Sequence, residues 1–148
     1  MEHKEILRVT AKLAASSRDA RLLMTETFRL LQRERPHYHW VGIYLLEGNE
    51  LILGPYVGKP TPHTRIPLNQ GICGAAASSG QTLIVDDVNA DPRYLACSLE
   101  TRSEIVVPIV REGRVLGEID IDSDRPAAFT ADDRALVESV AEILAASL

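Results

Sequence analysis

Residues 103–123, "SEIVVPIVREGRVLGEIDIDS", contain the pattern that most limits how this chain folds. Two runs rich in β-branched residues meet at Glu112-Gly113, and such runs joined by a two-residue turn with glycine are typical of a β-hairpin. The second run alternates isoleucines with carboxylates: Glu118, Ile119, Asp120, Ile121 and Asp122. Because successive side chains point to opposite faces of a strand, we expect the isoleucines to face the core and the carboxylates the other face.

The rest of the chain predicts another hairpin, around Gly48-Asn49, and helices before and after the two hairpins. We expect one helix over about 2–15, a second from a cap at Ser16 or Ser17 to Pro36, and a third over 71–80. A fourth helix is expected from a capping box at Thr130 and Asp133 to about 147. Strands are expected over 39–48, 49–58, 64–68 and 82–87. Helices at both ends and hairpins between them indicate an antiparallel sheet covered by helices.

Length and composition are those of one ordinary globular domain, since 148 residues is close to the commonest domain size. We predict a single α+β domain over 1–148, with N-terminal helices over about 2–35, a sheet core over about 39–122 and a C-terminal helix over about 130–147. The net charge of −5 and the lack of a Lys/Arg run argue against nucleic acid as a partner. Without an apolar run of about 20 residues or a signal peptide, neither a membrane span nor export is expected. The expected location is cytoplasmic.

Cys73 and Cys97 are the two cysteines of the chain. A reducing cytosol disfavours a permanent disulfide between them. Cys73 begins the predicted helix 71–80, where the helix N-terminus lowers the pKa of a thiol, but Ala75–Ala77 equally indicate a small, packed side chain. Cys97 lies in a predicted loop, where a structural apolar side chain has less to pack against, so it is the better candidate nucleophile.

No metal site is predicted. Structural zinc uses closely spaced ligand pairs, and His37 and His39, the one close pair, lack further ligands nearby in sequence. A calcium loop starting at Asp120 would need Gly and Glu where Arg125 and Ala131 stand. The aligned carboxylates are therefore either a solvated face or a recess for a cation, and the ammonium group of a ligand fits them better than a metal.

For three further residues the sequence allows both a structural and a functional interpretation. Glu104 at the mouth of an apolar strand is either an ordinary strand-end charge or a functional acid. Trp40 and Tyr44 lie four residues apart in one predicted strand and so project from the same face. They belong either to the core or to the wall of a small-molecule pocket.

The segments "WVGIYLLE", "LILGPYVGK", "TRIP", "GICGAAA", "YLACSLETRSEIVVPIV" and "GEIDIDSD" follow one another in this chain. In this order they resemble a stand-alone GAF domain and, more narrowly, the free methionine-(R)-sulfoxide reductases. The resemblance runs from about Trp40 to the final helix. It implies a GAF-like antiparallel sheet flanked by helices on both sides, a homodimer, and a small-molecule substrate.

The resemblance implies that the chain reduces free methionine-(R)-sulfoxide to methionine, with Cys97 as the attacking thiol. Glu104, Asp120 and Asp122 would surround the polar end of the substrate, with Trp40 and Tyr44 beside it. Sulfur chemistry then predicts a sulfenic acid on Cys97 and Glu104 as the acid that protonates the departing oxygen. An external dithiol such as thioredoxin would restore the thiols, with no bound cofactor.

The chain departs from these reductases at one position. They typically carry a further, resolving cysteine shortly after the "GK" turn, where this sequence has Pro62 or His63. Cys73 is the candidate resolving thiol in its place, provided that its Cα comes within about 7 Å of that of Cys97. Otherwise a small thiol or the reductant itself must attack the sulfenic acid. The alternative function is a non-catalytic GAF module that binds a small amino-acid-like ligand as a sensor or regulatory protein.

Overall fold

The computed structural model describes residues 1–95 and 99–148, so Cys97 lies outside the described residues. The described elements are the helices α1 (His3–Ser16), α2 (Ala20–Glu34), α3 (Gly71–Ser79) and α4 (Ala131–Ala145), a short 3₁₀ helix η1 (Val88–Ala90), and the strands β1 (Trp40–Glu47), β2 (Glu50–Val57), β3 (Arg65–Pro67), β4 (Leu83–Val85), β5 (Ser103–Arg111) and β6 (Arg114–Ser123).

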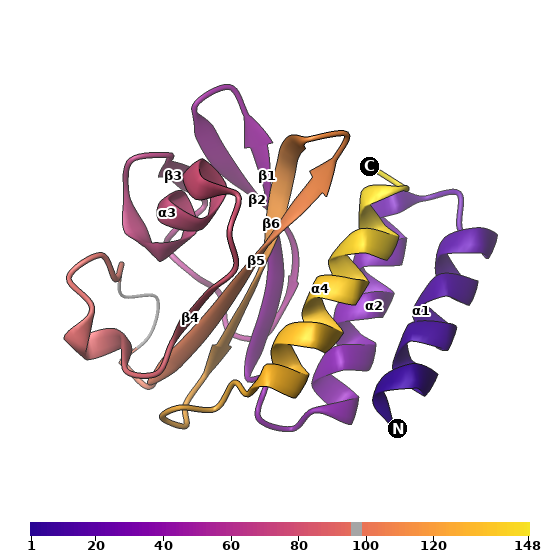
Figure 1. The fold of residues 1–148 in the computed structure, drawn as a ribbon, viewed down its shortest axis with the longest axis horizontal. Helices are drawn as coiled ribbons and strands as arrows, with labels where there is room; N and C mark the ends of the chain where they lie inside the picture. Colours follow the sequence, from indigo (N-terminus) through magenta and orange to yellow (C-terminus); the bar gives the residue numbers. More distant parts are fainter. Residues whose placement is uncertain (96–98) are drawn as a thin grey trace.

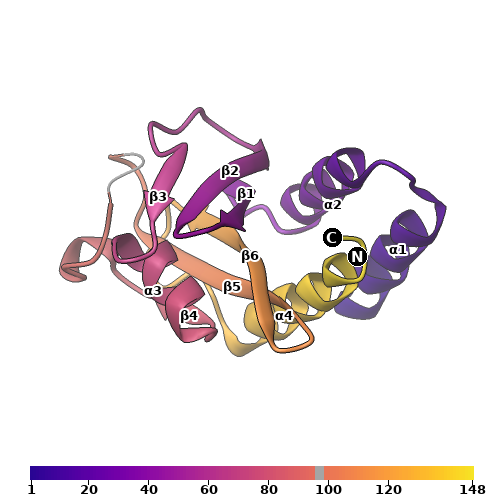
Figure 2. The same ribbon diagram turned by 90° about the horizontal axis from the view of Figure 1, so that it is seen from above.

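The strands form one antiparallel sheet in the order β3-β2-β1-β6-β5-β4, so the predicted sheet is confirmed. Helices α2 and α4 pack on one face of the sheet, α1 packs against these two helices on their side away from the strands, and α3 lies on the opposite face (Figures 1 and 2). The expectation of helices on both sides of the sheet is therefore also confirmed.

The two faces of the sheet bury two separate hydrophobic clusters. The larger one lies beneath α1, α2 and α4 and contains Ile119 and Ile121, as the alternation in β6 predicts. The smaller one lies beneath α3 and contains Trp40, Tyr44 and Cys73. The carboxylates of β6 therefore point into the side of the molecule that α3 covers.

Local signals in the sequence explain most element ends. The β5–β6 turn has positive φ angles at Glu112 (54°) and Gly113 (76°), the conformation that a tight hairpin turn requires. The predicted capping box of α4 is present between Thr130 and Asp133. The predicted cap of α2 at Ser16 or Ser17 is wrong, because the Asp19 carboxylate accepts the first backbone N–H groups of that helix.

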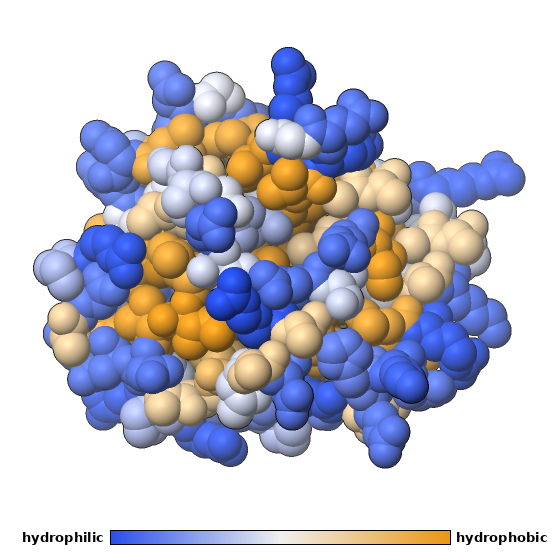
Figure 3. Space-filling model, viewed as in Figure 1, coloured by the Kyte–Doolittle hydropathy of each residue, from blue (hydrophilic) through white to orange (hydrophobic). Residues whose placement is uncertain are grey.

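No helix in the described ranges is both long and apolar enough to cross a membrane. Figure 3 shows hydrophilic side chains spread over the whole of the visible face, with hydrophobic residues between them.

Asp133 fastens the start of α4 to the segment that leads into β1. Its carboxylate accepts hydrogen bonds from the Tyr38 hydroxyl (2.6 Å) and the Thr130 backbone N–H (2.8 Å), and it lies 3.1 Å from His37 Nε2. Burial alone would raise the pKa of Asp133, but these hydrogen bonds outweigh it and hold the pKa below its ordinary value. The charged form of Asp133 therefore stabilises the fold.

We expect Asp133→Asn to lower the free energy of unfolding by about 1–3 kcal/mol at pH 7, because it weakens several bonds to one buried group. The loss should shrink as the pH falls below about 4. A depressed pKa stabilises the native state above the unfolded-state value of about 3.9, and this contribution disappears as the native carboxylate is protonated. Urea unfolding at a series of pH values measures this. The control is Asp132→Asn, which removes the same charge from an exposed site one residue away, and an equal loss in both variants would contradict the assignment.

Candidate functional site

Strands β1, β6 and β5 place the candidate residues in rows on one face of the sheet. Across the β1–β6 pair, the register matches Trp40 with Asp122, Gly42 with Asp120, and Tyr44 with Glu118. Across the β6–β5 pair, Asp122 lies opposite Glu104. Since directly paired residues of neighbouring strands share a face, the two aromatic rings and the four carboxyl groups line the same side.

The four carboxyl groups are buried, which rules out the solvated-face interpretation in this structure. Glu118 is fully buried, Asp120 is 1% exposed, and Glu104 and Asp122 are each 4% exposed. Both Glu118 carboxylate oxygens, Asp120 Oδ1 and Asp122 Oδ1 have no hydrogen-bond partner among the described residues. Unsatisfied buried carboxyl oxygens are rare in folded proteins, so this recess is built to receive hydrogen-bond donors or positive charge.

Burial also controls the protonation of the recess. Desolvation raises the pKa of Glu104 well above its ordinary value, and the neighbouring charges of Asp120 and Asp122 raise it further. The pKa values of Glu118, Asp120 and Asp122 are raised as well, in each case mainly by burial. The recess therefore holds protons at a pH where exposed carboxylates have lost theirs, and it can exchange them with a ligand.

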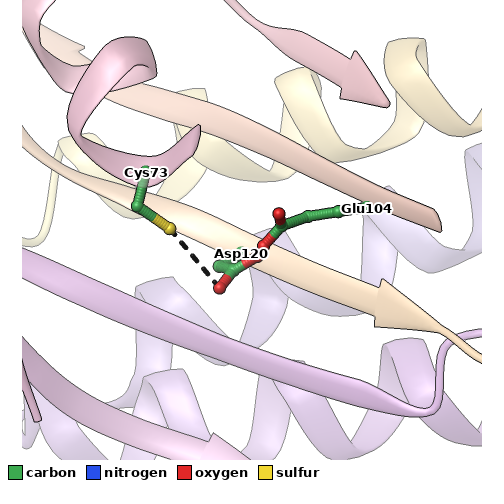
Figure 4. Close-up of side chains that lie close together, drawn as sticks. All are labelled: Cys73, Glu104 and Asp120. Carbon is green, nitrogen blue, oxygen red and sulfur yellow. Dashed lines mark hydrogen bonds between the residues drawn. The ribbon is translucent and has the colours of Figure 1, made fainter. Parts of the chain in front are cut away.

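Cys73 lies on α3 directly above the carboxyl groups. Its thiol is 6% exposed, and Sγ donates a hydrogen bond to Asp120 Oδ2 at 3.5 Å. Figure 4 shows Cys73, Glu104 and Asp120 pointing toward one another from α3, β5 and β6. Of the two interpretations of Cys73, the structure favours the small, packed side chain, because burial and the nearby acidic groups raise the thiol pKa well above its ordinary value.

Small residues allow α3 to lie this close to the sheet. Ala76 and Ala77 are buried in the cluster beneath the helix. A Cβ atom at Gly74 would come within 2.7 Å of the Leu68 carbonyl oxygen, so glycine is needed where the helix meets that loop. The helix ends at Gly80, whose φ of 68° makes it a left-handed cap, a conformation that glycine adopts readily.

The aromatic residues form a wall that is fixed to the loop after β2. The Trp40 ring stacks on Tyr56 (5.4 Å between centroids) and on Tyr44 (6.5 Å). Trp40 Nε1 donates to the Lys59 carbonyl (2.9 Å), and the Tyr44 hydroxyl donates to the His63 carbonyl (2.7 Å). Both rings belong to the smaller hydrophobic cluster, and Trp40 and Tyr44 each also line a cavity.

Two cavities flank the row of carboxyl groups. One of about 190 Å³ is lined by Trp40, Asp122, Lys59, Glu100 and their neighbours. The other, of about 10 Å³, is lined by Tyr44, Cys73, Glu104, Asp120 and residues around them. The larger cavity is below the roughly 300–1,000 Å³ typical of drug-sized ligands, and the smaller one is the size of a single water molecule.

The structure brings together six of the seven site residues predicted from the sequence, namely Cys73, Glu104, Trp40, Tyr44, Asp120 and Asp122; the seventh, Cys97, lies outside the described residues. Sequence reasoning did not assign Gly42, Lys59 or Glu118 to the site. The sequence did contain a signal for Glu118, since it lies two residues before Asp120 and therefore projects from the same face of the strand. Nothing in the sequence pattern marks Gly42 or Lys59, since each depends on a neighbour from elsewhere in the chain.

Gly42 leaves the space that the Trp40 ring occupies. A Cβ atom built on Gly42 would lie 2.5 Å from the Trp40 ring, much closer than atoms of folded proteins approach. We expect Gly42→Ala to displace the indole and to cost about 1–3 kcal/mol of stability through overpacking. Trp40 is the single tryptophan, so its fluorescence emission reports the displacement directly.

Gly48→Ala is the matched control for this change, because a Cβ atom there meets nothing within 4 Å. It should cost some stability, since Gly48 has a φ of 61°, but leave Trp40 emission unchanged. Unchanged emission in Gly42→Ala would show that the indole does not depend on this space.

Glu118 is expected to destabilise the ligand-free fold. Burial raises the native pKa of Glu118, so below the unfolded-state pKa of about 4.3 the group is protonated in both states and does not change the free energy of unfolding. As the pH rises above about 4.3, the unfolded state loses this proton first, and the native state becomes less stable. Glu118→Gln should therefore raise the free energy of unfolding at pH 8 by about 1–3 kcal/mol, with a smaller gain at pH 5. Thermal unfolding measures both, with the exposed Glu142→Gln as control; no gain, or a gain that grows toward low pH, would contradict the assignment.

Comparisons with known proteins identify the family of the chain. The GAF domain family matches residues 19–148. The free methionine-R-sulfoxide reductase of Escherichia coli is 36% identical over 126 residues, which are 82% of this chain and 76% of that protein.

Solved structures point to the same relatives. The structure of a type II free methionine-R-sulfoxide reductase from Thermoplasma acidophilum superposes with a TM-score of 0.84 at 42% identity, covering 86% of this chain and 90% of that one. The free methionine-R-sulfoxide reductase from Neisseria meningitidis in complex with its substrate gives a TM-score of 0.92 at 36% identity, covering 97% of this chain and 86% of that one. The chain therefore belongs to the GAF domain family and, within it, to a group of relatives that includes the free methionine-R-sulfoxide reductases.

Proposed function

We propose that this protein reduces free methionine-(R)-sulfoxide to methionine with Cys97 as the attacking thiol. The observation that carries the proposal is the buried recess of Glu104, Glu118, Asp120 and Asp122 beneath the Cys73 thiol and beside an aromatic wall. Relatives at 36–42% identity are named for this activity. The substrate preference for the R form comes from these relatives.

The recess fits the ammonium group of a free amino acid. An ammonium group offers three donors and a positive charge, and the recess offers oxygens on Asp120 and Asp122 that have no hydrogen-bond partner within residues 1–95 and 99–148. In a buried site such a charge-assisted contact is stronger than a neutral hydrogen bond. A methionine sulfoxide within a peptide has an amide in place of the ammonium group, so this recess selects the free amino acid.

Lys59 is the residue that we assign to the substrate carboxylate. It lines the larger cavity together with Asp122 and pairs there with Glu100. A zwitterion whose ammonium group meets Asp122 can place its carboxylate near Lys59 in the same cavity. The exposed Lys59–Glu100 pair contributes little stability and so is readily exchanged for a ligand.

The proposed chemistry is an oxygen transfer from one sulfur atom to another. The Cys97 thiolate attacks the sulfoxide sulfur and an S–S bond forms; the protonated oxygen then passes to the Cys97 sulfur as the S–O and S–S bonds break, which leaves Cys97 as a sulfenic acid and releases methionine. The sulfoxide sulfur is reduced and the cysteine sulfur is oxidised by two electrons each. Glu104, whose raised pKa keeps a proton available, supplies it to the departing oxygen.

Cys73 is the proposed resolving thiol in the absence of a cysteine near Pro62 and His63. Its sulfur attacks the Cys97 sulfenic acid, a disulfide forms and water leaves. The raised Cys73 pKa means that the thiol must lose its proton at this step, and Asp120 accepts the Sγ hydrogen bond and is placed to take it. An external dithiol such as thioredoxin then reduces the disulfide by exchange, with no bound cofactor.

This cycle requires a reducing compartment, so we propose a cytoplasmic location. Dimer formation stays a prediction from the family resemblance.

The first test is a single turnover, because it needs no resolving thiol. Reduced protein is mixed with an equal amount of free methionine-R-sulfoxide, and the methionine released is quantified. We expect about one methionine per chain from the wild type, almost none from Cys97→Ser, and a normal first turnover but slower recycling from Cys73→Ser. Asp122→Asn should raise the substrate concentration needed for half-maximal turnover at least tenfold, which corresponds to about 1.4 kcal/mol.

Asp132→Asn is the matched control, since it removes the same charge from an exposed residue of α4 that is not among those lining the cavity. No methionine from folded wild-type protein with free thiols would favour the non-catalytic GAF module. Equal first-turnover losses in Cys73→Ser and Cys97→Ser would contradict the separate roles of the two thiols.

A further inference from the structure

We infer that Cys73, Glu104 and Asp120 form a binding site for a zinc-type divalent ion in the reduced protein. The sequence shows no metal pattern, because the three residues come from α3, β5 and β6 and are separated by long stretches of chain. The fold brings one sulfur and two carboxylate oxygens to within 4.8 Å of one another, with all three residues buried. Figure 4 shows the three side chains converging.

The distance between the Cys73 and Asp120 donor atoms matches that of two ligands on a tetrahedral ion. Zinc binds thiolate sulfur at about 2.3 Å and carboxylate oxygen at about 2.0–2.2 Å, which places a sulfur and an oxygen ligand about 3.5 Å apart. Cys73 Sγ and Asp120 Oδ2 are 3.5 Å apart. The proton that joins them now is the one that a bound ion would displace.

Two independent features show that the site has capacity for a ligand. Asp120 is 1% exposed, and its Oδ1 atom has no hydrogen-bond partner among the described residues. The cavity of about 10 Å³ is lined by all three donors and has the size of one small atom or ion. Three protein ligands and one water molecule are the usual set of a zinc site with an open position.

The donor chemistry selects among cations. Calcium takes six to eight oxygen ligands and magnesium an octahedral shell of oxygens, and neither prefers sulfur. A buried thiolate with two carboxylates suits zinc and its chemical analogue cadmium. A dication would also balance the negative charge that burial otherwise disfavours at Glu104, Asp120 and the nearby Glu118.

Zinc and substrate would exclude each other. The ion would occupy Asp120, which we assign to the substrate ammonium group, and Glu104, the proposed acid. It would also hold Cys73 as a thiolate unavailable for resolution. The metal site goes beyond the proposed reaction and does not depend on it, since it concerns the reduced protein without a sulfoxide.

The test is binding of Zn²⁺ to the reduced full-length chain by calorimetry, with Cd²⁺ as a spectroscopic probe of metal–thiolate bonds. We expect one ion per chain and a cadmium–thiolate absorption band in the near ultraviolet. Cys73→Ser should abolish the band and weaken zinc binding at least tenfold. Asp120→Asn, a change of one atom that keeps the shape of the side chain, should weaken zinc binding at least tenfold but retain the band.

Cys97→Ser is the matched control, since it removes the other thiol and leaves the three ligands in place; both band and affinity should persist. Circular dichroism confirms that each variant is folded. Absence of saturable binding, binding that is unchanged in Cys73→Ser and Asp120→Asn, or a band lost in Cys97→Ser would each overturn the site. None of these results bears on methionine release, which is measured without metal.

Discussion

The structure depends most on one unfavourable arrangement, the burial of four carboxyl groups on one face of an antiparallel sheet. Glu104, Glu118, Asp120 and Asp122 are at most 4% exposed, and several of their oxygens have no hydrogen-bond partner in the part of the chain that the structure describes. Charged groups removed from water in this way cost several kcal/mol each unless protons or a cation compensate them. The ligand-free fold therefore holds protons in the recess, and a ligand that brings positive charge relieves the same cost.

The remainder of the fold makes this arrangement tolerable. Isoleucines on the opposite face of β6 anchor the sheet to the larger core under α1, α2 and α4. Because that core is large and apolar, the second face can hold an unfavourable polar row without unfolding the domain. Helix α3 closes the recess from above, and its small residues let it approach closely enough to bring the Cys73 thiol into contact with Asp120. One face of the sheet thus supplies most of the apolar core, and the other face holds the candidate site.

Tight burial also explains the character of Cys73. A thiol at a helix N-terminus in contact with solvent is acidic, but here desolvation and neighbouring carboxyl groups act in the opposite direction. Cys73 is therefore a protonated, unreactive thiol at rest. Under the proposed function this suits a second, resolving role, because a thiol that reacts only when a proton acceptor and a sulfenic acid lie beside it is protected from random oxidation.

Much of the fold was predictable from sequence, because hairpins, caps and the period of two in β6 are local signals. The carboxylate row was visible as well, since the alternation of Glu118, Asp120 and Asp122 with isoleucines places them together without any knowledge of the rest of the chain. The cap of α2 was misplaced because Ser16, Ser17 and Asp19 are all good caps, and only the path of the chain selects Asp19.

The sequence by itself determined which side chains share a face, because the pleat of a strand follows from backbone geometry alone. Whether that face meets water was decided by the tertiary structure, since it depends on where α3 packs. The same holds for the convergence of Cys73, Glu104 and Asp120, for the placement of the Trp40 ring over Gly42, and for the direction of every pKa shift in the recess. Solvation and distance between segments far apart in the chain set these properties, and no local pattern encodes them.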